Sequence, residues 1–511
     1  KAGQGSLLSS TSSTQGRAAA LAMAMESAGP TAKKMKLAPP GIHEATHPNP
    51  AIPEIRSQEQ PPEAEEDGGE ELPDRISDLP DGVLGEIISL LPTKDAARTQ
   101  ALASRWRHLW RAAPLNLDCR ALPGDDAGVL PGVILSAHEG PVHCLCLPAR
   151  LLQYVADAVE AWLRSPALDN LQELEFYAPL RFNSQSRLHA VLPASISRFS
   201  STLRVATISQ CHLSDHTVET LRFPQLRKLA IVDAKISEVS LHRIISTGCP
   251  GLECLLLSTI SGAHCLRINS TTLRSIGVRQ SIWELIFEDA PLRELIIEDA
   301  PSLERLLHLE MHMEMQISVI SAPKLETLGC ISEGSRHNRV VFGATVIQGL
   351  RIDNLTTVVC TVKILDIHML LFDLDKLIGL MRCFPCLEKL YMKNSQSGEK
   401  NLWRHKHLNF LCSHEIRLKT VVMGWYRGIR AQVNFASFLV LNARVLESIR
   451  LVVAPSDYNE EFFEEQHRML QMDKRASRGA QLCFTAVCSH DVEGIHDVSH
   501  LDLTDPFACG C

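Results

Sequence analysis

The residues best suited to metal chemistry form a group in the last third of the chain: Cys383, Cys386, His405, His407, Cys412 and His414. Thiolate and imidazole groups bind zinc tetrahedrally, so a C-x-x-C pair followed by histidines is a candidate zinc site. However, the spacing matches no tight pair of zinc knuckles, and buried cysteine commonly fills an apolar core. We predict core cysteines and no metal here, with zinc as the alternative.

A second candidate is the run from Leu309 to Val319, where methionines alternate with polar residues around His312. Thioether and imidazole groups suit copper. Strict alternation predicts instead a half-buried strand, whose methionines point inward while His312 points outward. The methionines are therefore expected to fill a core, and no cofactor is predicted.

Enzyme signatures are missing from the sequence. It contains no nucleotide-binding glycine-rich loop, no G-x-S-x-G elbow and no H-E-x-x-H motif. A non-catalytic protein is the prediction.

The amino-acid composition argues against two classes of partner, nucleic acids and membranes. The chain has 511 residues, with 51 lysines and arginines against 59 aspartates and glutamates, which gives a net charge of -8. This balance argues against direct nucleic-acid binding through bulk positive charge. No apolar stretch reaches the roughly 20 residues of a membrane span, so no membrane contact is predicted. The 16 cysteines are scattered without a secretory signal, which predicts reduced thiols in the nucleus or the cytoplasm.

Residues 1–73 are rich in proline and carry an acidic run from Glu63 to Glu71, without a periodic apolar pattern. Such a segment buries too little apolar surface to offset its ordering entropy, so a disordered tail is predicted. The first two dozen residues, which begin at Lys1 rather than at a methionine, are left out of the fold prediction.

From Asp74 to Ala112 the apolar spacing predicts three short helices. Apolar residues recur at helical intervals at Val83, Leu84, Ile87, Ile88 and Leu91, and again at Trp106, Leu109 and Trp110. Three helices in about 40 residues enclose only a small core. An apolar face is therefore expected to remain for a partner.

This segment resembles the F-box of plant proteins. The matching residues are Leu79-Pro80, Leu84, the run from Ile87 to Pro92, Arg98-Thr99, and Arg105-Trp106-Arg107 with Leu109-Trp110; Ala97 and Ala103 depart from the usual pattern. The resemblance implies docking to a Skp-type adaptor and, through it, to a cullin. The residues that would supply the contact or hold its helices are Leu79, Pro80, Leu84, Ile87, Leu91, Pro92, Leu102 and Trp106.

Past residue 140 a phrase recurs that is apolar at its first, fourth and sixth places. It starts at Leu171, Leu203, Leu226, Leu252, Leu273, Leu292, Leu325, Leu387, Leu418 and Leu446. The intervals between starts are irregular but often in the twenties. Together with an alternating strand in each phrase, they predict leucine-rich repeats, stacked as an α/β horseshoe over a shared core. The fold class predicted for the chain is therefore α/β, a short three-helix F-box followed by this solenoid.

The third and fifth places of the phrase point away from the shared core and would form the concave face. The candidate residues for binding a target are Lys228, Glu294, Lys389, Tyr391 and Arg450. Their charges have no dominant sign, which favours a protein ligand over a phosphate backbone; the alternative is that they are simply solvated.

The stretch from Cys383 to Val453 resembles the FBD region of plant F-box proteins, carried by FPCLEKLYM, IRLKTVVMGWYRG and LESIRL. The predicted organisation is a tail (1–73), the F-box (74–112), repeats (113–380), FBD-like terminal repeats and cap (381–455) and a C-terminal tail (456–511).

Three functions are open at this stage. The leading one is a substrate-recognition subunit of a Skp–cullin–F-box ubiquitin ligase, whose protein substrate is unknown. The second is an interaction scaffold, which would bind the adaptor through its F-box without delivering substrates. A ligand-assisted, hormone-type receptor would need a deep pocket with convergent polar groups.

Overall fold

A computed structural model describes residues 76–121 except 77, 128–178, 189–279, 291–308, 315–333, 338–394, 399–400, 415–486 and 497–508. The predicted disordered tail, residues 1–73, lies outside these ranges. The chain divides into two compact units, Lys1–Pro114 and Leu115–Cys511. We call their described parts the helical unit and the repeat unit.

The helical unit contains the three short helices expected from the apolar spacing. They are α2 (Asp81–Leu90), α3 (Thr93–Arg98) and α4 (Ser104–Ala112), with a 3-10 turn, η1 (Thr99–Ala101), after α3. Pro80 and Pro92 stand at the N-caps of α2 and α3, where a missing N–H removes no helical hydrogen bond. Its core consists of Leu84, Ile88, Ala96, Trp106 and Ala113.

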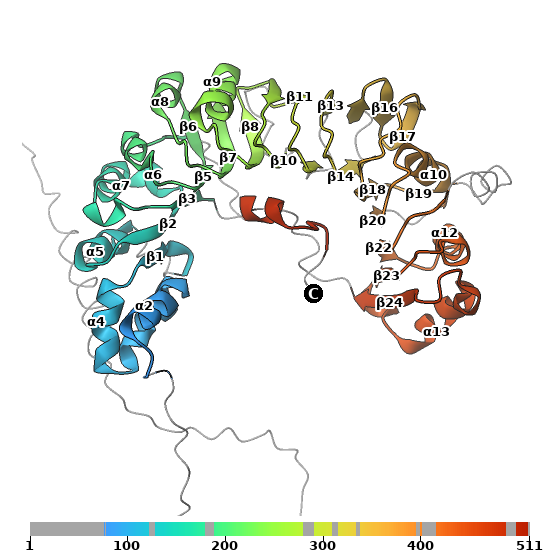
Figure 1. Ribbon diagram of the computed structural model, residues 1–511, viewed down its shortest axis with the longest axis horizontal. Coiled ribbons are helices and arrows are strands. Elements are labelled where there is room, and N and C mark those ends of the chain that lie inside the picture. Colours follow the sequence, from blue (N-terminus) through green and yellow to red (C-terminus); the bar gives the residue numbers. More distant parts are fainter. Residues whose placement is uncertain are drawn as a thin grey trace, which may run out of the picture. The chain divides into compact units, whose positions relative to one another are not determined.

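The repeat unit is built on one 16-stranded sheet that curves around its inner face (Figure 1). The paired strands are parallel, in the order β1 (Leu115–Asp118), β2 (Val142–Pro148), β3 (Glu173–Tyr177), β5 (Val205–Ser209), β7 (Lys228–Ile236), β8 (Cys254–Ser261), β10 (Ser275–Arg279), β12 (Arg305–His308), β14 (Thr327–Ser332), β18 (Ile364–Met369), β20 (Lys389–Asn394), β22 (Thr420–Tyr426), β23 (Ser448–Val453) and β24 (Gln481–Ala486). Off this path, β6 (Cys211–Leu213) pairs with β7, and β4 (Ala190–Val191) pairs with β6. The sheet thus continues to β24, past residue 455, where the cap was expected to end.

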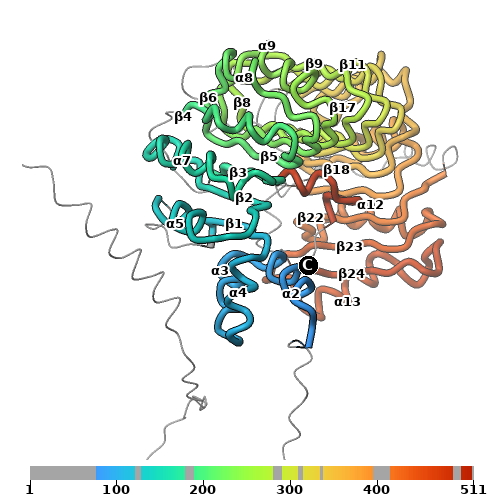
Figure 2. The backbone as a smooth tube through the Cα atoms, turned by 60° about the vertical axis from the view of Figure 1, so that its left-hand side comes forward, coloured from blue at the N-terminus to red at the C-terminus, as the bar shows by residue number. Residues whose placement is uncertain are grey.

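Helices cover the outer side toward both ends of this sheet, and the successive turns stack on one another (Figures 1 and 2). They are α5 (Leu130–Ala137), α6 (Leu151–Tyr154), α7 (Ala156–Leu163), α8 (Asp215–Thr220), α9 (Glu238–Arg243), α10 (Leu374–Cys383), α12 (Arg430–Asn442) and α13 (Glu460–Met469). Short turns are η2 (Cys119–Ala121), η4 (Pro166–Leu168), η5 (Ala194–Phe199), η6 (Ile244–Gly248), η8 (Pro455–Asp457), η9 (Met472–Lys474) and η11 (Val498–Asp502). Ser214 and Ser237 cap α8 and α9 through hydrogen bonds from Thr217 N and Ser240 N.

In the middle of the array the outer layer is a second sheet. It runs in the order β17 (Arg351–Asn354), β16 (Thr345–Gln348), β15 (Arg339–Phe342), β13 (Gln316–Val319), β11 (Glu294–Asp299) and β9 (Cys265–Asn269). A third, two-stranded sheet pairs β19 (Phe372–Asp373) with β21 (Glu399–Lys400).

The second sheet changes the interpretation of two predicted strands. The phrase that starts at Leu292 forms β11 in the outer sheet, and the inner strand of that turn is β12. The strand predicted from Leu309 to Val319 is present over its described part, as β13, whereas Met311 to Met313 lie outside the described residues. The fourth and sixth places of the phrase are buried in β7 of the large sheet, as Leu229 and Ile231, and in β11 of the second sheet, as Leu295 and Ile297, so the apolar pattern alone does not distinguish the layers.

Candidate functional site

The helical unit exposes one row of apolar side chains on α2. Val83, Ile87 and Leu90 follow at helical intervals of four and three residues and are all exposed, Leu90 by 82%. Leu84 and Ile88, on the other side of α2, are buried against α4. We call Val83, Ile87 and Leu90 the α2 stripe.

The eight residues expected to bind an adaptor fall into three groups. Leu84 and Trp106 are buried and hold the helices together, while Leu79 and Leu91 are half-buried against that core. Exposed residues are Pro80, Ile87, Pro92 and Leu102. Val83 and Leu90 were missing from the expected set, although their spacing from Ile87 places them on one helical face.

An arginine ties the start of α2 to α4. Arg105 donates from Nε to Asp81 Oδ1 at 2.7 Å and from Nη2 to the carbonyl oxygen of Leu79 at 2.7 Å. Because one guanidinium spans both acceptors, it fixes the approach to α2 relative to α4. This contact explains how the short segment before the helix keeps Leu79 against the small core.

Four of the five predicted target-binding residues lie on the inner face of the large sheet. Lys228 is on β7, Lys389 and Tyr391 are on β20, and Arg450 is on β23. Glu294 lies on β11 of the outer sheet, so its placement on the concave face was wrong. The reason is that the phrase from Leu292 belongs to the outer layer.

The inner face is partly covered by the chain's own residues 497–508, which we call the C-terminal segment (Figure 1). Lys228 Nζ lies 3.1 Å from Asp502 Oδ2. Lys389 Nζ lies 2.7 Å from Asp505 Oδ2, and the Tyr391 hydroxyl donates to the same oxygen at 2.8 Å. Three of the predicted residues therefore already bind an acidic ligand, which sequence reasoning missed.

Charge and burial shift the pKa values of two side chains near this contact, Asp366 and Tyr391. Burial raises the pKa of Asp366 on β18 to about 6, and the positive charge of Lys393 opposes that rise. Burial also raises the pKa of Tyr391, as do the hydrogen bond and charge of Asp505, whereas Arg450 lowers it. The inner face at β18 and β20 is thus desolvated where the C-terminal segment crosses it.

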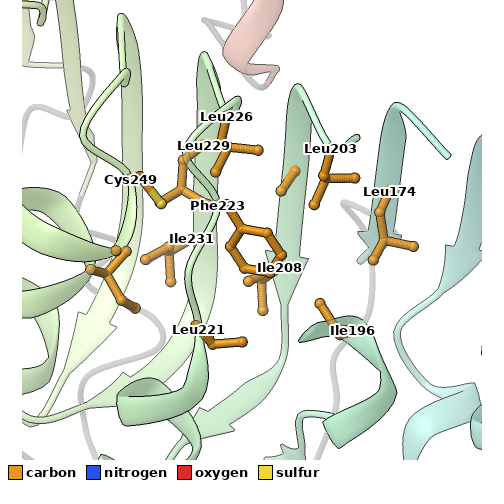
Figure 3. A pocket seen from close by; sticks show the side chains of 13 residues that line it. Leu174, Ile196, Leu203, Ile208, Leu221, Phe223, Leu226, Leu229, Ile231 and Cys249 are labelled. Atoms are coloured by element: carbon orange, nitrogen blue, oxygen red, sulfur yellow. The ribbon is translucent and has the colours of Figure 1, made fainter. Parts of the chain in front are cut away.

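Behind the sheet lies an apolar cavity between the two layers (Figure 3). Its volume is about 20 Å³, and its lining includes Leu174, Ile196, Phe223 and Cys249. That volume holds about one water molecule, and its lining is almost entirely apolar. It gives no support to a pocket for a hormone-sized ligand.

The structure describes only two of the six candidate metal ligands. Cys383 is buried and Cys386 is half-buried, while His405, His407, Cys412 and His414 lie outside the described residues. Burial raises the pKa of the Cys383 thiol to about 11, which disfavours the thiolate that binds metals. Within the described ranges, no three His, Cys, Asp or Glu residues are grouped as metal ligands would be.

Among the residues that the structure places, no helix is long and apolar enough to cross a membrane. None of the 12 cysteines in these ranges forms a disulfide.

Comparison with known proteins finds a family model that matches part of each unit. Residues 76–118 match the F-box domain, and residues 159–392 match the LRR repeats of the FBD-associated F-box protein At5g56370 family. Among similar proteins of Arabidopsis thaliana, the F-box/FBD/LRR-repeat protein At1g13570 is 27% identical over 43% of this chain and 52% of its own length. The putative F-box/FBD/LRR-repeat protein At5g22610 is 31% identical over 40% of this chain and 42% of its own.

The matched region thus spans about half the length of these curated relatives, or less. The residues that the two family models match include the described helices α2 to α4, the inner strands from β3 to β18 and the first part of β20. The chain therefore contains a match to the F-box domain followed by leucine-rich repeats similar to those of FBD-associated F-box proteins.

Proposed function

We propose that the chain is a substrate-recognition subunit of a Skp–cullin–F-box ubiquitin ligase. The observation that carries the proposal is the α2 stripe of the F-box. Three apolar side chains are exposed on one helix of a unit whose core is small. Such a row is normally covered by a partner, because apolar surface gains free energy when it leaves water.

In this proposal the α2 stripe contacts the Skp-type adaptor, and Leu102, which is 67% exposed, extends the apolar surface. Leu84 and Trp106 act indirectly, since they are buried and hold α2 against α4. The adaptor in turn joins the chain to a cullin. The chain would act in the nucleus or the cytoplasm, where the cysteines of the described ranges, none of which is in a disulfide, would stay reduced.

The repeat unit would hold a protein target on the inner face of its sheet. We assign the chain no catalytic step: it would bring the lysines of a target close to a ubiquitin-conjugating enzyme bound elsewhere in the complex. Proximity and orientation alone account for large rate effects in such an arrangement.

The test is reconstitution from purified full-length chain, a plant Skp-type adaptor and a cullin, followed by size-exclusion chromatography. We expect all three proteins to elute together. Adaptor without cullin would favour the scaffold, and failure to bind the adaptor would contradict the proposal. The matched variants that probe the α2 stripe are given in the Discussion.

A further inference from the structure

The C-terminal segment is bound across the inner face as a separate ligand would be. Val498 and Leu501 are completely buried in a cluster with Ala230, Leu256 and Leu307, which come from β7, β8 and β12. Residues 487–496 join this segment to β24, the last strand of the sheet. The segment therefore returns to strands in the middle of the array instead of extending its end.

A glycine makes room for the central aliphatic side chain. Gly277 lies on β10, and a Cβ atom added there would be 2.8 Å from Leu501 Cδ2 and 3.1 Å from Leu256 Cδ1. Glycine inside a strand weakens it and often marks a close approach of another group. Here that approaching group is Leu501.

A second glycine makes room for an aromatic ring. A Cβ atom added at Gly329 on β14 would lie 2.7 Å from Phe507 Cζ. Phe507 also contacts the ring of Tyr391, with 5.7 Å between the centroids. The aliphatic and aromatic side chains of the segment thus occupy two different places on the inner face.

Acidic residues between these apolar contacts meet basic residues of the sheet. Asp502 is paired with Lys228 on β7, and Asp505 is paired with Lys389 on β20. These strands are six positions apart in the order of the sheet. The segment therefore runs across the strands. Counted from the aliphatic residue Val498, its pattern has a second aliphatic residue three places later (Leu501), acidic residues four and seven places later (Asp502 and Asp505) and an aromatic residue nine places later (Phe507).

We propose that the inner face recognises this pattern in its protein target, and that the C-terminal segment is an internal occupant which the target displaces. The target class is a short acidic segment with two aliphatic anchors and an aromatic residue. The claim that a protein target binds the inner face rests on the proposed function. The claim that the C-terminal segment occupies that face does not rest on it. Complementarity is supplied by Lys228 and Lys389 for charge, and by Gly277 and Gly329 for shape.

Because the C-terminal segment is covalently linked to the sheet, the length of the linker predicts how strongly the segment competes with a free peptide for the inner face. Ten residues join β24 to Asp497, and short linkers give an effective concentration on the order of millimolar. A free peptide whose Kd for the open face is on the order of 0.1 mM would then bind the intact chain about tenfold more weakly.

The experiment uses full-length chain and a labelled peptide with the sequence of residues 497–508, followed by fluorescence anisotropy. The Leu501→Asp variant should release the segment and bind the peptide about tenfold more tightly than the unaltered chain. Leu503→Asp is the matched control, because Leu503 is 49% exposed in the same segment. It should bind the peptide as the unaltered chain does.

Adding Gly277→Leu to Leu501→Asp should abolish peptide binding, because the new side chain would fill the place of Leu501. A peptide that itself carries Leu501→Asp should not bind. Equal affinities for the Leu501→Asp and Leu503→Asp chains would overturn the proposal. So would absence of peptide binding to the Leu501→Asp chain at millimolar concentration.

Peptide display on the Leu501→Asp chain tests the target class. Selected sequences should carry aliphatic residues three places apart and acids at the positions that match Asp502 and Asp505; basic or unpatterned sequences would overturn this part. Adaptor binding measured on the same samples separates the two proposals. Loss of adaptor binding with peptide binding intact contradicts only the ligase role, and the converse contradicts only the internal occupant.

Discussion

The hydroxyl group of Tyr391 donates a hydrogen bond of 2.8 Å to Asp505, which lies 114 residues further along the chain. The same carboxylate oxygen lies 2.7 Å from Lys389 Nζ, so two side chains of one strand hold it. Asp505 is close to fully buried in this contact, with 10% of its side chain exposed. A carboxylate in that environment depends on both partners, because a buried charge is costly to leave unpaired.

Tyr391→Phe should loosen the C-terminal segment without unfolding the sheet. The variant keeps the ring that contacts Phe507 and removes one hydrogen bond to a charged group, which is worth about 1.5–3 kcal/mol. Amide hydrogen exchange in residues 498–507 should therefore become roughly ten- to a hundredfold faster. Tyr458→Phe, at an exposed tyrosine, is the control, and equal exchange in both variants would contradict the assignment.

Asp366→Asn should change how stability depends on pH. Burial raises the pKa of Asp366 to about 6, against the opposing charge of Lys393. A raised carboxyl pKa means that the folded protein binds the proton more tightly than the unfolded chain does. The stabilising contribution is complete below about pH 4 and is lost as the pH rises through 6.

Asparagine resembles the protonated carboxyl group, so the variant should be more stable than the unaltered chain at pH 7, by about 1–3 kcal/mol. The difference should disappear near pH 4. Chemical denaturation at pH 4, 5, 6 and 7 measures it. Cys330 and Asp505 also act on this carboxyl group, and an effect of the same size at every pH would show that they, rather than protonation, set the stability.

Leu90→Asp should weaken adaptor binding at least tenfold and leave the melting temperature of the chain unchanged. Its side chain is exposed, so a charge there costs little until a partner must cover it. Affinity is measured by calorimetry with the purified adaptor. Ile320→Asp, at a residue 71% exposed on the repeat unit, should bind as the unaltered chain does. If both variants bind equally, the α2 stripe is not the contact.

Leu84→Ala should act through folding. Leu84 is fully buried in a core of few residues, and truncating such a leucine costs about 2–5 kcal/mol. We expect the F-box to lose protection in hydrogen exchange while the strands of the repeat unit keep theirs. Adaptor binding lost with full protection retained would instead make Leu84 a direct contact.

Two alanine substitutions at glycines should differ in their effects. At Gly277 the new Cβ meets only the ends of leucine side chains, which can shift, so the melting temperature should change by no more than about 2 °C. At Gly329 it meets Asp366 Cβ at 2.7 Å and Asp366 N at 3.2 Å, so backbone must move. Gly329→Ala should therefore melt several degrees lower, and thermal denaturation of both variants checks the order.

The inner strands could be predicted because their leucines alternate at fixed places, as at Leu226 and Leu387. The layer of a strand could not be predicted, since β11 of the outer sheet buries Leu295 and Ile297 at the same fourth and sixth places of the phrase as an inner strand does. On α2, Leu84 and Leu90 differ only in which side meets α4, and that depends on tertiary packing. The C-terminal segment carries no local signal for contact with β7, β8 and β10, which lie more than 200 residues earlier.

The outer sheet also affects the bending of the array. An α-helix with its side chains is about 10–12 Å wide, whereas neighbouring strands are about 4.8 Å apart. Helices on the outer side therefore hold successive turns farther apart there than on the inner side, and this curves the inner sheet. Where the outer element is a strand instead, the outer and inner layers have the same spacing between turns. The turns from β8 to β14 are followed by β9, β11, β13 and β15 of the outer sheet, so we expect the array to bend less there than where helices back it. A ligand on this stretch would then meet a flatter surface than a ligand on the turns that helices back.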